Sequence, residues 1–277
     1  MKKRKIRNRI LLGIFLYAFM LIWIYPFFSI FINSFKTTKE MMTQFLALPT
    51  IWNVDHYAKA WETLDFGRAF VNTLVVTILG VIGLVIFDSM AAYKLARTKN
   101  RWSRLLFLCF RIPMLVPLQT IMISTTQVAK ALHLNGSLFG LTVMYWGIST
   151  PFCVFLYHGF MKSVPGEMDE SALIDGASYF QTFWYIIFPM IKPITATAVI
   201  INGLYIWNDF ILPLILVSGN KDNRTLQMAI YTNFGSQGVK WETALPSIVM
   251  AILPSILFFI VMQKHIIKGI TAGAVKG

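Results

Sequence analysis

Long apolar segments separated by short charged stretches dominate this chain. Six of these segments approach or exceed the roughly 20 helical residues that cross a bilayer core of about 30 Å. They cover residues 10–32, 69–93, 105–128, 138–161, 194–217 and 244–262. They are too long for barrel strands, and in lipid a helix satisfies its backbone groups within one segment. We therefore predict an all-α membrane protein with six transmembrane helices in a single transmembrane domain, residues 1–277.

Composition agrees with a bilayer environment. The chain is 56% hydrophobic and 13% charged, whereas soluble domains average about 25% charged residues. The net charge of +13 is compatible with nucleic-acid binding, but the basic residues cluster beside the ends of the spans. Anionic lipid headgroups account for that placement. We therefore expect contact with membrane lipid and no nucleic-acid partner.

The positions of lysine and arginine orient the spans. Six basic residues precede the first span, and five more fall between residues 94 and 104. Because cytoplasmic loops carry the excess of positive charge, the N-terminus is expected in the cytoplasm. With six spans the C-terminus is also cytoplasmic, as is the loop 162–193. The loops 33–68 and 218–241 then face outside, and we expect the second of these to be solvent-facing.

Two charged residues inside the spans are expected at matching depths. Asp88 lies about five residues from the inner end of the second span and Arg111 about six from that of the third. At about 1.5 Å per residue their depths agree, so the two side chains are candidates for an ion pair. Snorkelling toward the interface and a role in transport are the alternatives.

Asp209 lies deeper, beside Trp207, Asn208 and Phe210 in a span that we expect Pro213 to interrupt. Aromatic faces together with amide and carboxylate groups suit sugar recognition, because the rings stack on C–H surfaces while hydroxyls find polar partners. The same polar groups also hold helices together by hydrogen bonds. Both interpretations stay open from the residues alone.

Signals for catalysis are missing from the sequence. Cys109 and Cys153 are the only cysteines, and both fall within spans without metal-ligand spacing. No cluster typical of a catalytic site occurs in the spans, which argues against a membrane enzyme. No GxxxxGK[ST] phosphate loop occurs either, so any nucleotide hydrolysis that drives this protein belongs to another chain.

The loop 162–193 is the most informative stretch. Pro165 suits a first helical turn, acids follow where the helix dipole favours them, and Gly176 is suited to end the helix. We predict a short helix from about 165 to 175, whose small residues permit close approach to another protein. Aromatic residues at 179–185 then suit the membrane interface. An amphipathic helix that packs on its own bundle is the alternative.

Motif spacing points to a family. One pattern resembles the EAA motif of ABC-importer permeases. It consists of Glu170-Ser171-Ala172, then Gly176 after three residues, Ile186 after nine more, and Phe188-Pro189. Ser171 stands where that family usually has Ala, and Phe188 where it usually has Leu. Segments 91–97, 207–214 and 268–277 are similar to elements of the carbohydrate-uptake, MalG-like branch. The resemblance covers residues 10–277.

The resemblance implies a permease subunit of an ATP-driven importer for a sugar or oligosaccharide, in a bacterial or archaeal cell membrane. In that family the EAA helix seats in the ATPase, a role that falls here on Glu170, Ser171, Ala172 and Gly176. The implied partners are a second homologous permease, two cytoplasmic ATPase subunits and an extracellular solute-binding protein. ATP and Mg would bind the ATPase, so this chain needs no cofactor or metal of its own. Candidate pathway residues are Trp207, Asn208, Asp209 and Phe210.

Two other functions remain open. An ion-coupled secondary transporter would use Asp88, Asp209 or Arg111 as coupling sites between its helices. An ABC permease for a non-sugar solute would carry an EAA-type loop as well. The segments at 207–214 and 268–277 favour carbohydrate, but the sequence does not identify the sugar.

Overall fold

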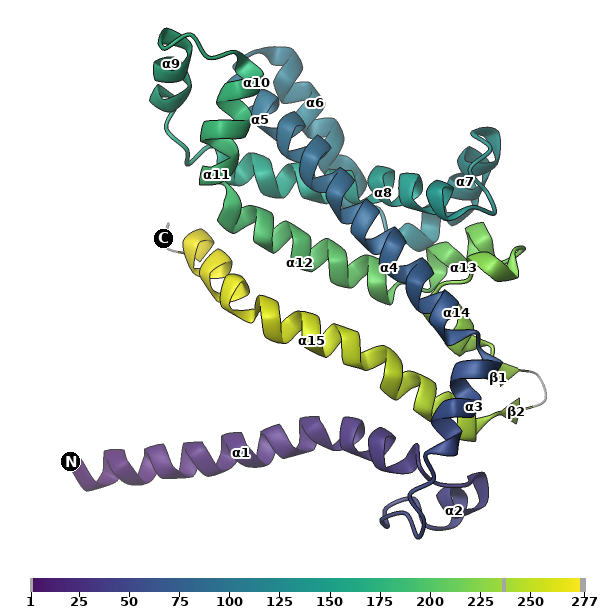
Figure 1. Ribbon diagram of the computed structural model, residues 1–277. Coiled ribbons are helices and arrows are strands. Elements are labelled where there is room, and N and C mark those ends of the chain that lie inside the picture. The colour runs from purple at the N-terminus through teal and green to yellow at the C-terminus, as the bar shows by residue number, and fades with distance from the viewer. Residues whose placement is uncertain (1, 236–237, 275–277) are drawn as a thin grey trace. The chain divides into compact units, whose positions relative to one another are not determined.

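Helices dominate the computed structural model, which describes residues 2–235 and 238–274 (Figure 1). Within those ranges the strands are limited to β1 (Phe234–Gly235) and β2 (Gly238–Val239), an antiparallel hairpin. The prediction of an all-α protein is confirmed. The chain forms two compact units: one ends at Phe66 and includes Ala229–Leu253, and the other contains Gly67–Met228 and the chain from Pro254 onward.

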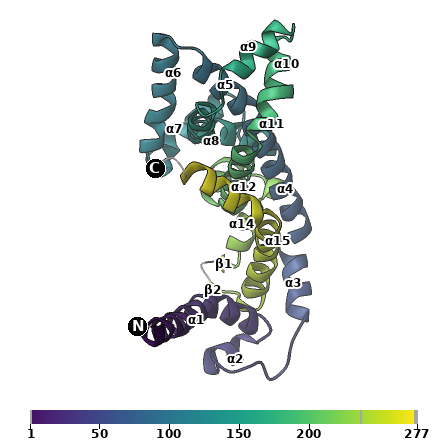
Figure 2. The ribbon, with the colours of Figure 1, turned by 90° about the vertical axis from the view of Figure 1, so that its left-hand side faces the viewer.

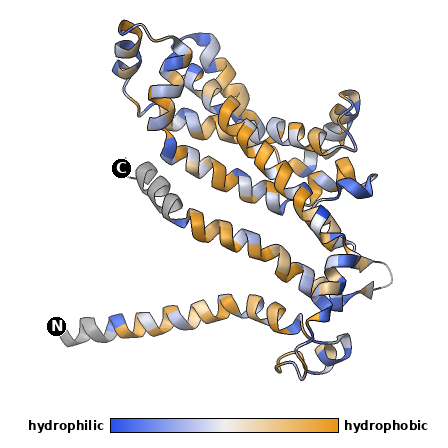
Figure 3. Ribbon diagram, in the orientation of Figure 1, coloured by the Kyte–Doolittle hydropathy of each residue, from blue (hydrophilic) through white to orange (hydrophobic). Residues whose placement is uncertain are grey.

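The first unit contains α1 (Lys2–Asn33), α2 (Thr38–Thr43), α3 (Asp55–Thr63), the β1–β2 hairpin and the beginning of α15 (Trp241–Ala274). From residue 10 onward its helix α1 is largely apolar on all sides (Figure 3), and none of its most apolar 18-residue window is buried. A helix that is hydrophobic all round requires lipid or another protein around it. The first predicted span, 10–32, lies inside this helix.

A buried lysine organises the turn after α2. Lys36 is 2% exposed, and its ammonium donates hydrogen bonds to the carbonyls of Gln44, Phe45 and Ala47 at 2.8, 3.2 and 2.6 Å. These three acceptors use all three donors of the ammonium group. The segment 36–47 is thereby folded around one positive charge.

Glu40 of α2 fixes the end of this segment through contacts with Thr50. Its carboxylate accepts hydrogen bonds from the backbone N–H of Thr50 at 2.6 Å and from the Thr50 hydroxyl at 2.9 Å. These two donors, the backbone N–H first, hold the pKa of Glu40 below its usual value. Two oppositely charged side chains therefore shape residues 36–50, which sequence analysis treated only as an external loop.

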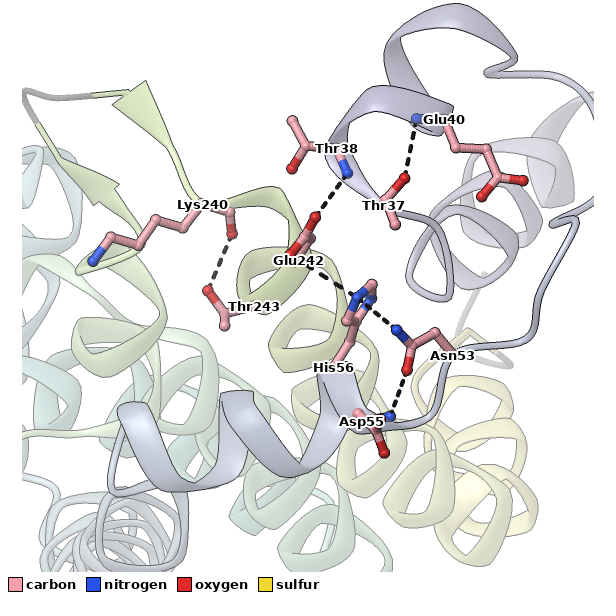
Figure 4. A network of polar contacts seen from close by, with 9 residues as sticks. All are labelled: Thr37, Thr38, Glu40, Asn53, Asp55, His56, Lys240, Glu242 and Thr243. Carbon is pink, nitrogen blue, oxygen red and sulfur yellow. Dashed lines mark hydrogen bonds and ion pairs between the residues drawn. The ribbon is translucent and has the colours of Figure 1, made fainter.

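A polar network joins α2 and α3 to the start of α15 (Figure 4). Glu242, in the first turn of α15, accepts a hydrogen bond from the Thr38 N–H at 3.0 Å and lies 4.0 Å from His56 Nε2. Asn53 contacts the same His56 nitrogen at 3.2 Å. The carboxylate is also favoured there by the positive end of the α15 dipole. One glutamate thus connects three helices of the first unit.

The second unit is built around α8 (Leu138–Met161), which contacts α5, α6, α12 and α13 and is seen nearly end-on in Figure 2. Tyr145, Cys153 and Tyr157 of α8 are fully buried and form the centre of the hydrophobic core. The other elements that begin before the loop 162–193 are α4 (Phe66–Gly83), η1 (Leu84–Asp88), α5 (Ser89–Arg97), α6 (Arg101–Arg111), η2 (Ile112–Leu115) and α7 (Leu118–Ala131). From that loop onward they are α9 (Glu167–Ile174), α10 (Tyr179–Gln181), η3 (Thr182–Ile187), α11 (Phe188–Met190), α12 (Lys192–Asn208), α13 (Ile211–Val217), η4 (Lys221–Asn223) and α14 (Leu226–Tyr231).

Four helices among the described residues are long and apolar enough to cross a membrane: Asn8–Asn33, Phe66–Arg97, Leu138–Met161 and Trp241–Gln263. Two bent pairs raise this number to six if each pair counts as one span. The pairs are Arg101–Leu115 with Leu118–Ala131, bent by 113°, and Tyr179–Met190 with Lys192–Asn208, bent by 78°. The protein is a multi-pass membrane protein, and the count of six spans stays a prediction.

Two predicted spans are not continuous helices. In the segment 105–128 the chain turns at η2, because Pro113 and Pro117 each lack a backbone N–H and cannot continue an α-helix. In the segment 194–217, α12 ends at Asn208 and Asp209 is extended with ψ 132°. The helix restarts at Ile211, so the interruption precedes Pro213. The hydropathy of each segment as a whole does not show where the helix breaks.

The expectation of a solvent-facing loop over 218–241 is wrong for residues 225–230, which are buried or half-buried, whereas residues 218–222 are exposed. Leu226 is completely buried, and its N–H donates to the Thr73 hydroxyl at 2.8 Å. Asn72 donates to the carbonyls of Asp222 and Arg224 at 2.7 and 2.9 Å. These bonds bring the loop onto α4, because polar side chains of that helix provide partners for the loop backbone.

Candidate functional site

The sequence of the loop 162–193 explains why α9 begins and ends where it does. Its first turn carries three acids, Glu167, Asp169 and Glu170, which the helix dipole favours. At its end the N–H of Ala177 bonds to the carbonyl of Ala172 at 3.0 Å, and the N–H of Gly176 to that of Leu173 at 3.1 Å. This is the Schellman pattern. The predicted helix of about 165–175 is confirmed as Glu167–Ile174.

Gly176 occupies the one position of this motif that needs a left-handed backbone. Its φ is +86°, and a Cβ added there would meet nothing within 4 Å inside this chain. A left-handed conformation costs an L-residue about 1–2 kcal/mol. The space beside Gly176 is therefore open, and only backbone strain opposes a small side chain at this position.

An ion pair attaches α9 to the end of α5. Arg97 Nη2 lies 2.8 Å from Asp169 Oδ2, and Arg97 Nη1 donates to the carbonyl of Val164 at 3.0 Å. The hydroxyl of Tyr93 donates to the other carboxylate oxygen of Asp169. These contacts hold the loop at its start and within the first turn of α9. No sequence motif indicates that Tyr93, Arg97 and Asp169 meet, although segment 91–97 carries part of the family resemblance.

The aromatic segment after α9 is divided between the core and the surface. Ser178 and Gln181 form a capping box that starts α10. Phe183 is buried and packs on Tyr93, with ring centroids 5.3 Å apart. Tyr179 is exposed, with the Lys94 ammonium 5.6 Å from its ring centroid. Only part of this segment is therefore available to a membrane interface.

The residues expected to couple α9 to a partner fall on two sides of the helix. Ala172 is 4% exposed and packs inward, whereas Glu170, Ser171 and Gly176 are exposed. Ile174 is 85% exposed, an unusual position for a large aliphatic side chain at the end of a polar helix. Contiguous exposed apolar surface marks sites of contact with other proteins, and Met168 and Leu173 of α9 are exposed as well.

The second group of candidate residues lies where α12 ends. Asp209 accepts hydrogen bonds from the Tyr145 hydroxyl of α8 at 2.8 Å and from the Ile211 N–H at 3.0 Å. It therefore starts α13 and connects it to the central helix. Asn208 is exposed and donates back to the Leu204 carbonyl at 2.8 Å, and Phe210 packs against the core around α8. These contacts give Asp209 a structural role, and contact with substrate stays a prediction.

Trp207 lines a cavity of about 210 Å³ within the second unit, between α4, α12 and the part of α15 after Pro254. The walls are mostly apolar. Among the described residues, Trp207 Nε1, Thr77 Oγ1 and Ser255 Oγ are buried without a hydrogen-bond partner, and all three residues line this cavity. Buried polar atoms normally have partners. These three atoms are buried within the walls rather than exposed to the cavity, so the cavity itself is apolar.

The expected pair of Asp88 and Arg111 does not form. Asp88 is buried and accepts from the Thr150 hydroxyl at 2.9 Å, while Arg111 is exposed with its guanidinium over the rings of Phe107 and Phe155, at 5.9 and 6.0 Å. In the described part of the chain no ion pair joins the two. Equal depth along two helices does not determine the direction in which each side chain points.

The fold and the helical loop define a polytopic membrane protein with a short, exposed helix between two of its apolar segments. The family model for the inner membrane component of binding-protein-dependent transport systems matches residues 89–271. The chain belongs to this family of ABC transporter permeases. The matched region includes the loop 162–193 and both groups of candidate residues.

Individual relatives cover almost the whole chain. It is 38% identical over 257 residues to the probable starch degradation products transport system permease protein AmyC of Thermoanaerobacterium thermosulfurigenes, covering 92% of this chain and 93% of the relative. It is 36% identical over 247 residues to the multiple sugar-binding transport system permease protein MsmG of Streptococcus mutans, covering 88% of each. A chain from the crystal structure of a bacterial ABC transporter involved in import of the acidic polysaccharide alginate matches with a TM-score of 0.80 and 25% identity, covering 94% of this chain and 95% of the other.

Proposed function

We propose that this chain is the transmembrane permease subunit of an ATP-driven importer for a sugar or oligosaccharide, and that α9 couples it to a separate ATPase. The observation that carries the coupling proposal is the construction of α9. The helix is tied to α5 by Arg97 and Asp169, yet it exposes Ile174 together with Glu170 and Ser171. A rigid helix with an uncovered apolar side chain suits insertion into a groove on a partner.

The substrate class rests on the relatives. Their names specify starch degradation products, multiple sugars, and melibiose, raffinose and stachyose. Identity of 34–38% over about nine-tenths of this chain supports the same broad class here. The pathway would run past Trp207, Asn208, Asp209 and Phe210, and Trp207 lines a small apolar cavity.

The remaining parts of the proposed importer are other chains. They are a second, homologous permease, two cytoplasmic ATPase subunits that bind ATP and Mg, and an extracellular solute-binding protein. The family description itself names dependence on a binding protein. Family membership favours this assembly over an ion-coupled secondary transporter, for which the described residues around Asp88 and Asp209 show ordinary interhelical hydrogen bonds.

Three variants at Gly176 test the coupling. Gly176→Ala and Gly176→Asn introduce a Cβ at a left-handed position, and Asn tolerates that conformation better than Ala. Gly176→Glu introduces a similar backbone strain and adds a long charged side chain on the exposed side of the loop. The assay is ATPase activity of the complex in nanodiscs, with the solute-binding protein and candidate sugars added.

We expect the Asn variant to keep stimulated ATPase activity, the Ala variant to lose part of it, and the Glu variant to lose most of it although the purified subunits remain stable. Equal activity of the Glu and Asn variants would contradict seating of this loop in the ATPase. Solute transport by the purified chain alone, driven by an ion gradient, would contradict the importer assignment altogether.

A further inference from the structure

A second surface of this chain gathers positive charge that the coupling proposal does not use. A pocket of about 700 Å³ is lined by residues from the end of α5, the helix α6 and the end of α8. These three helices contact one another and lie side by side in Figure 2. Its lining contains four cationic side chains, Lys99, Arg104, Arg111 and Lys162, and no carboxylate. The side chain of His158 completes the polar lining.

These four cations have no ionic partner within the described residues. None of them takes part in an ion pair there. Arg97, the last residue of α5 and two residues before Lys99, contrasts with them because it is paired with Asp169 at 2.8 Å. Like charges that converge on one pocket without counter-charges repel each other, and an anion bound among them removes that repulsion.

One wall of the pocket is apolar and leads to an apolar helix face. Phe107 and Leu108 belong to the lining, and the ring of His158 stacks on Phe107 with centroids 3.7 Å apart. Immediately before Phe107 in α6, Leu105 and Leu106 are exposed. Basic side chains next to exposed aliphatic ones match a ligand with an anionic head and an apolar tail.

The location of these charges in the sequence agrees with such a ligand. Residues 94–104 and Lys162 are expected on the cytoplasmic side of the membrane, the leaflet in which anionic lipids attract basic segments. Basic pockets between transmembrane helices on that side suit lipid phosphate groups. Arginine adds paired N–H donors that fit phosphate oxygens.

We propose that the pocket between α5, α6 and α8 binds the phosphate headgroup of an anionic phospholipid, with Arg104 and Arg111 as the main ligands and the acyl chains along α6. The proposal is independent of α9 and of the transported solute. It predicts one preferred site for an anionic lipid rather than a diffuse ring of lipids around the protein.

The test compares lipid retention by the assembled complex. Wild type and an Arg104→Gln/Arg111→Gln variant are purified in detergent, incubated with phosphatidylglycerol or phosphatidylcholine, and examined by native mass spectrometry. Arg101→Gln is the matched control, because Arg101 begins the same helix but lies outside the pocket lining, with its guanidinium 5.4 Å from the Trp102 ring. A charge-preserving Arg104→Lys/Arg111→Lys variant separates loss of charge from damage to the fold.

We expect the wild type, the control and the lysine variant to retain phosphatidylglycerol in preference to phosphatidylcholine, and the double glutamine variant to retain about tenfold less of it. Inorganic phosphate at millimolar concentration distinguishes the two sources of a phosphate group. Displacement of the lipid only by other anionic lipids supports a lipid site. Equal retention by the glutamine variant and the control, or full displacement by inorganic phosphate, would overturn the proposal.

Discussion

The contact between Arg97 and Asp169 predicts a measurable coupling between the second apolar helix and α9. The change is Arg97→Gln, which removes the ion pair at 2.8 Å and the bond to the Val164 carbonyl at 3.0 Å. The two side chains are 23% and 13% exposed, so water screens the pair only partly. A well-aligned hydrogen bond between charged groups contributes about 1.5–3 kcal/mol and a neutral one about 1 kcal/mol. The lower charged value suits this ion pair, because Asp169 Oδ2 lacks hydrogen-bond geometry.

With the lower value for the partly exposed pair, Arg97→Gln should cost the local fold about 2.5 kcal/mol. Asp169→Asn loses the charge but keeps an acceptor for the Tyr93 hydroxyl, so its cost should be about 1.5 kcal/mol. Both changes remove the same interaction. The double variant should therefore cost about 2.5 kcal/mol rather than the sum of about 4 kcal/mol.

Hydrogen–deuterium exchange of the amides between residues 163 and 177 measures this cost, because local opening sets their exchange rate. About 1.4 kcal/mol corresponds to a tenfold change, so exchange should be about seventyfold faster in Arg97→Gln and about tenfold faster in Asp169→Asn. Arg101→Gln, a change just beyond α5, should leave the exchange rate of these amides unchanged. Additive effects in the double variant would refute the coupling between Arg97 and Asp169.

Three further predictions follow from single residues. Lys36→Met should speed amide exchange in residues 36–47 by about thirtyfold, equivalent to about 2 kcal/mol, because three carbonyls lose a charged donor; the same change at the exposed Lys39 should have no effect. The lowered pKa of Glu40 means that its contribution to the order of the loop is complete above the usual glutamate pKa and is lost as the pH falls through the lowered value. Local opening at the Thr50 amide should therefore increase only as the pH falls through the lowered pKa of Glu40. The same extent of opening above and below that pKa would contradict the role of Glu40. If Asp209 contacts the transported sugar, Asp209→Asn should weaken the apparent affinity for uptake by about tenfold, equivalent to about 1.4 kcal/mol. Unchanged affinity in a stably inserted protein would contradict contact with the sugar and leave Asp209 with a structural role only.

Much of the fold follows from the sequence because the bilayer imposes strong constraints. Apolar runs of about 20 residues have few alternatives to helix in lipid, so the all-α class and most segment positions are readable directly. The helix α9 is equally readable, since Gly176 supplies a left-handed backbone and acids favour the first turn. Local chemistry determines these features and needs no distant contact.

Other features depend on contacts between residues far apart in the chain. The breaks at Pro113 and Asp209 lie inside predominantly apolar runs, and hydropathy alone does not distinguish a bent span from a straight one. The partners of Asp88 and Arg111 depend on the rotation of each helix about its axis, which apolar runs without a polar stripe leave undetermined.

The sequence by itself determined a helical membrane protein with a short helix in the loop 162–193, because periodicity, charge and capping act over a few residues. Only the tertiary structure decided that Arg97 meets Asp169, that Leu226 is buried near α4, and that four cations share one pocket. The physical reason is that packing between helices is set by the complementary shapes of side chains from separate segments. The direction in which each side chain points is defined only when those segments meet.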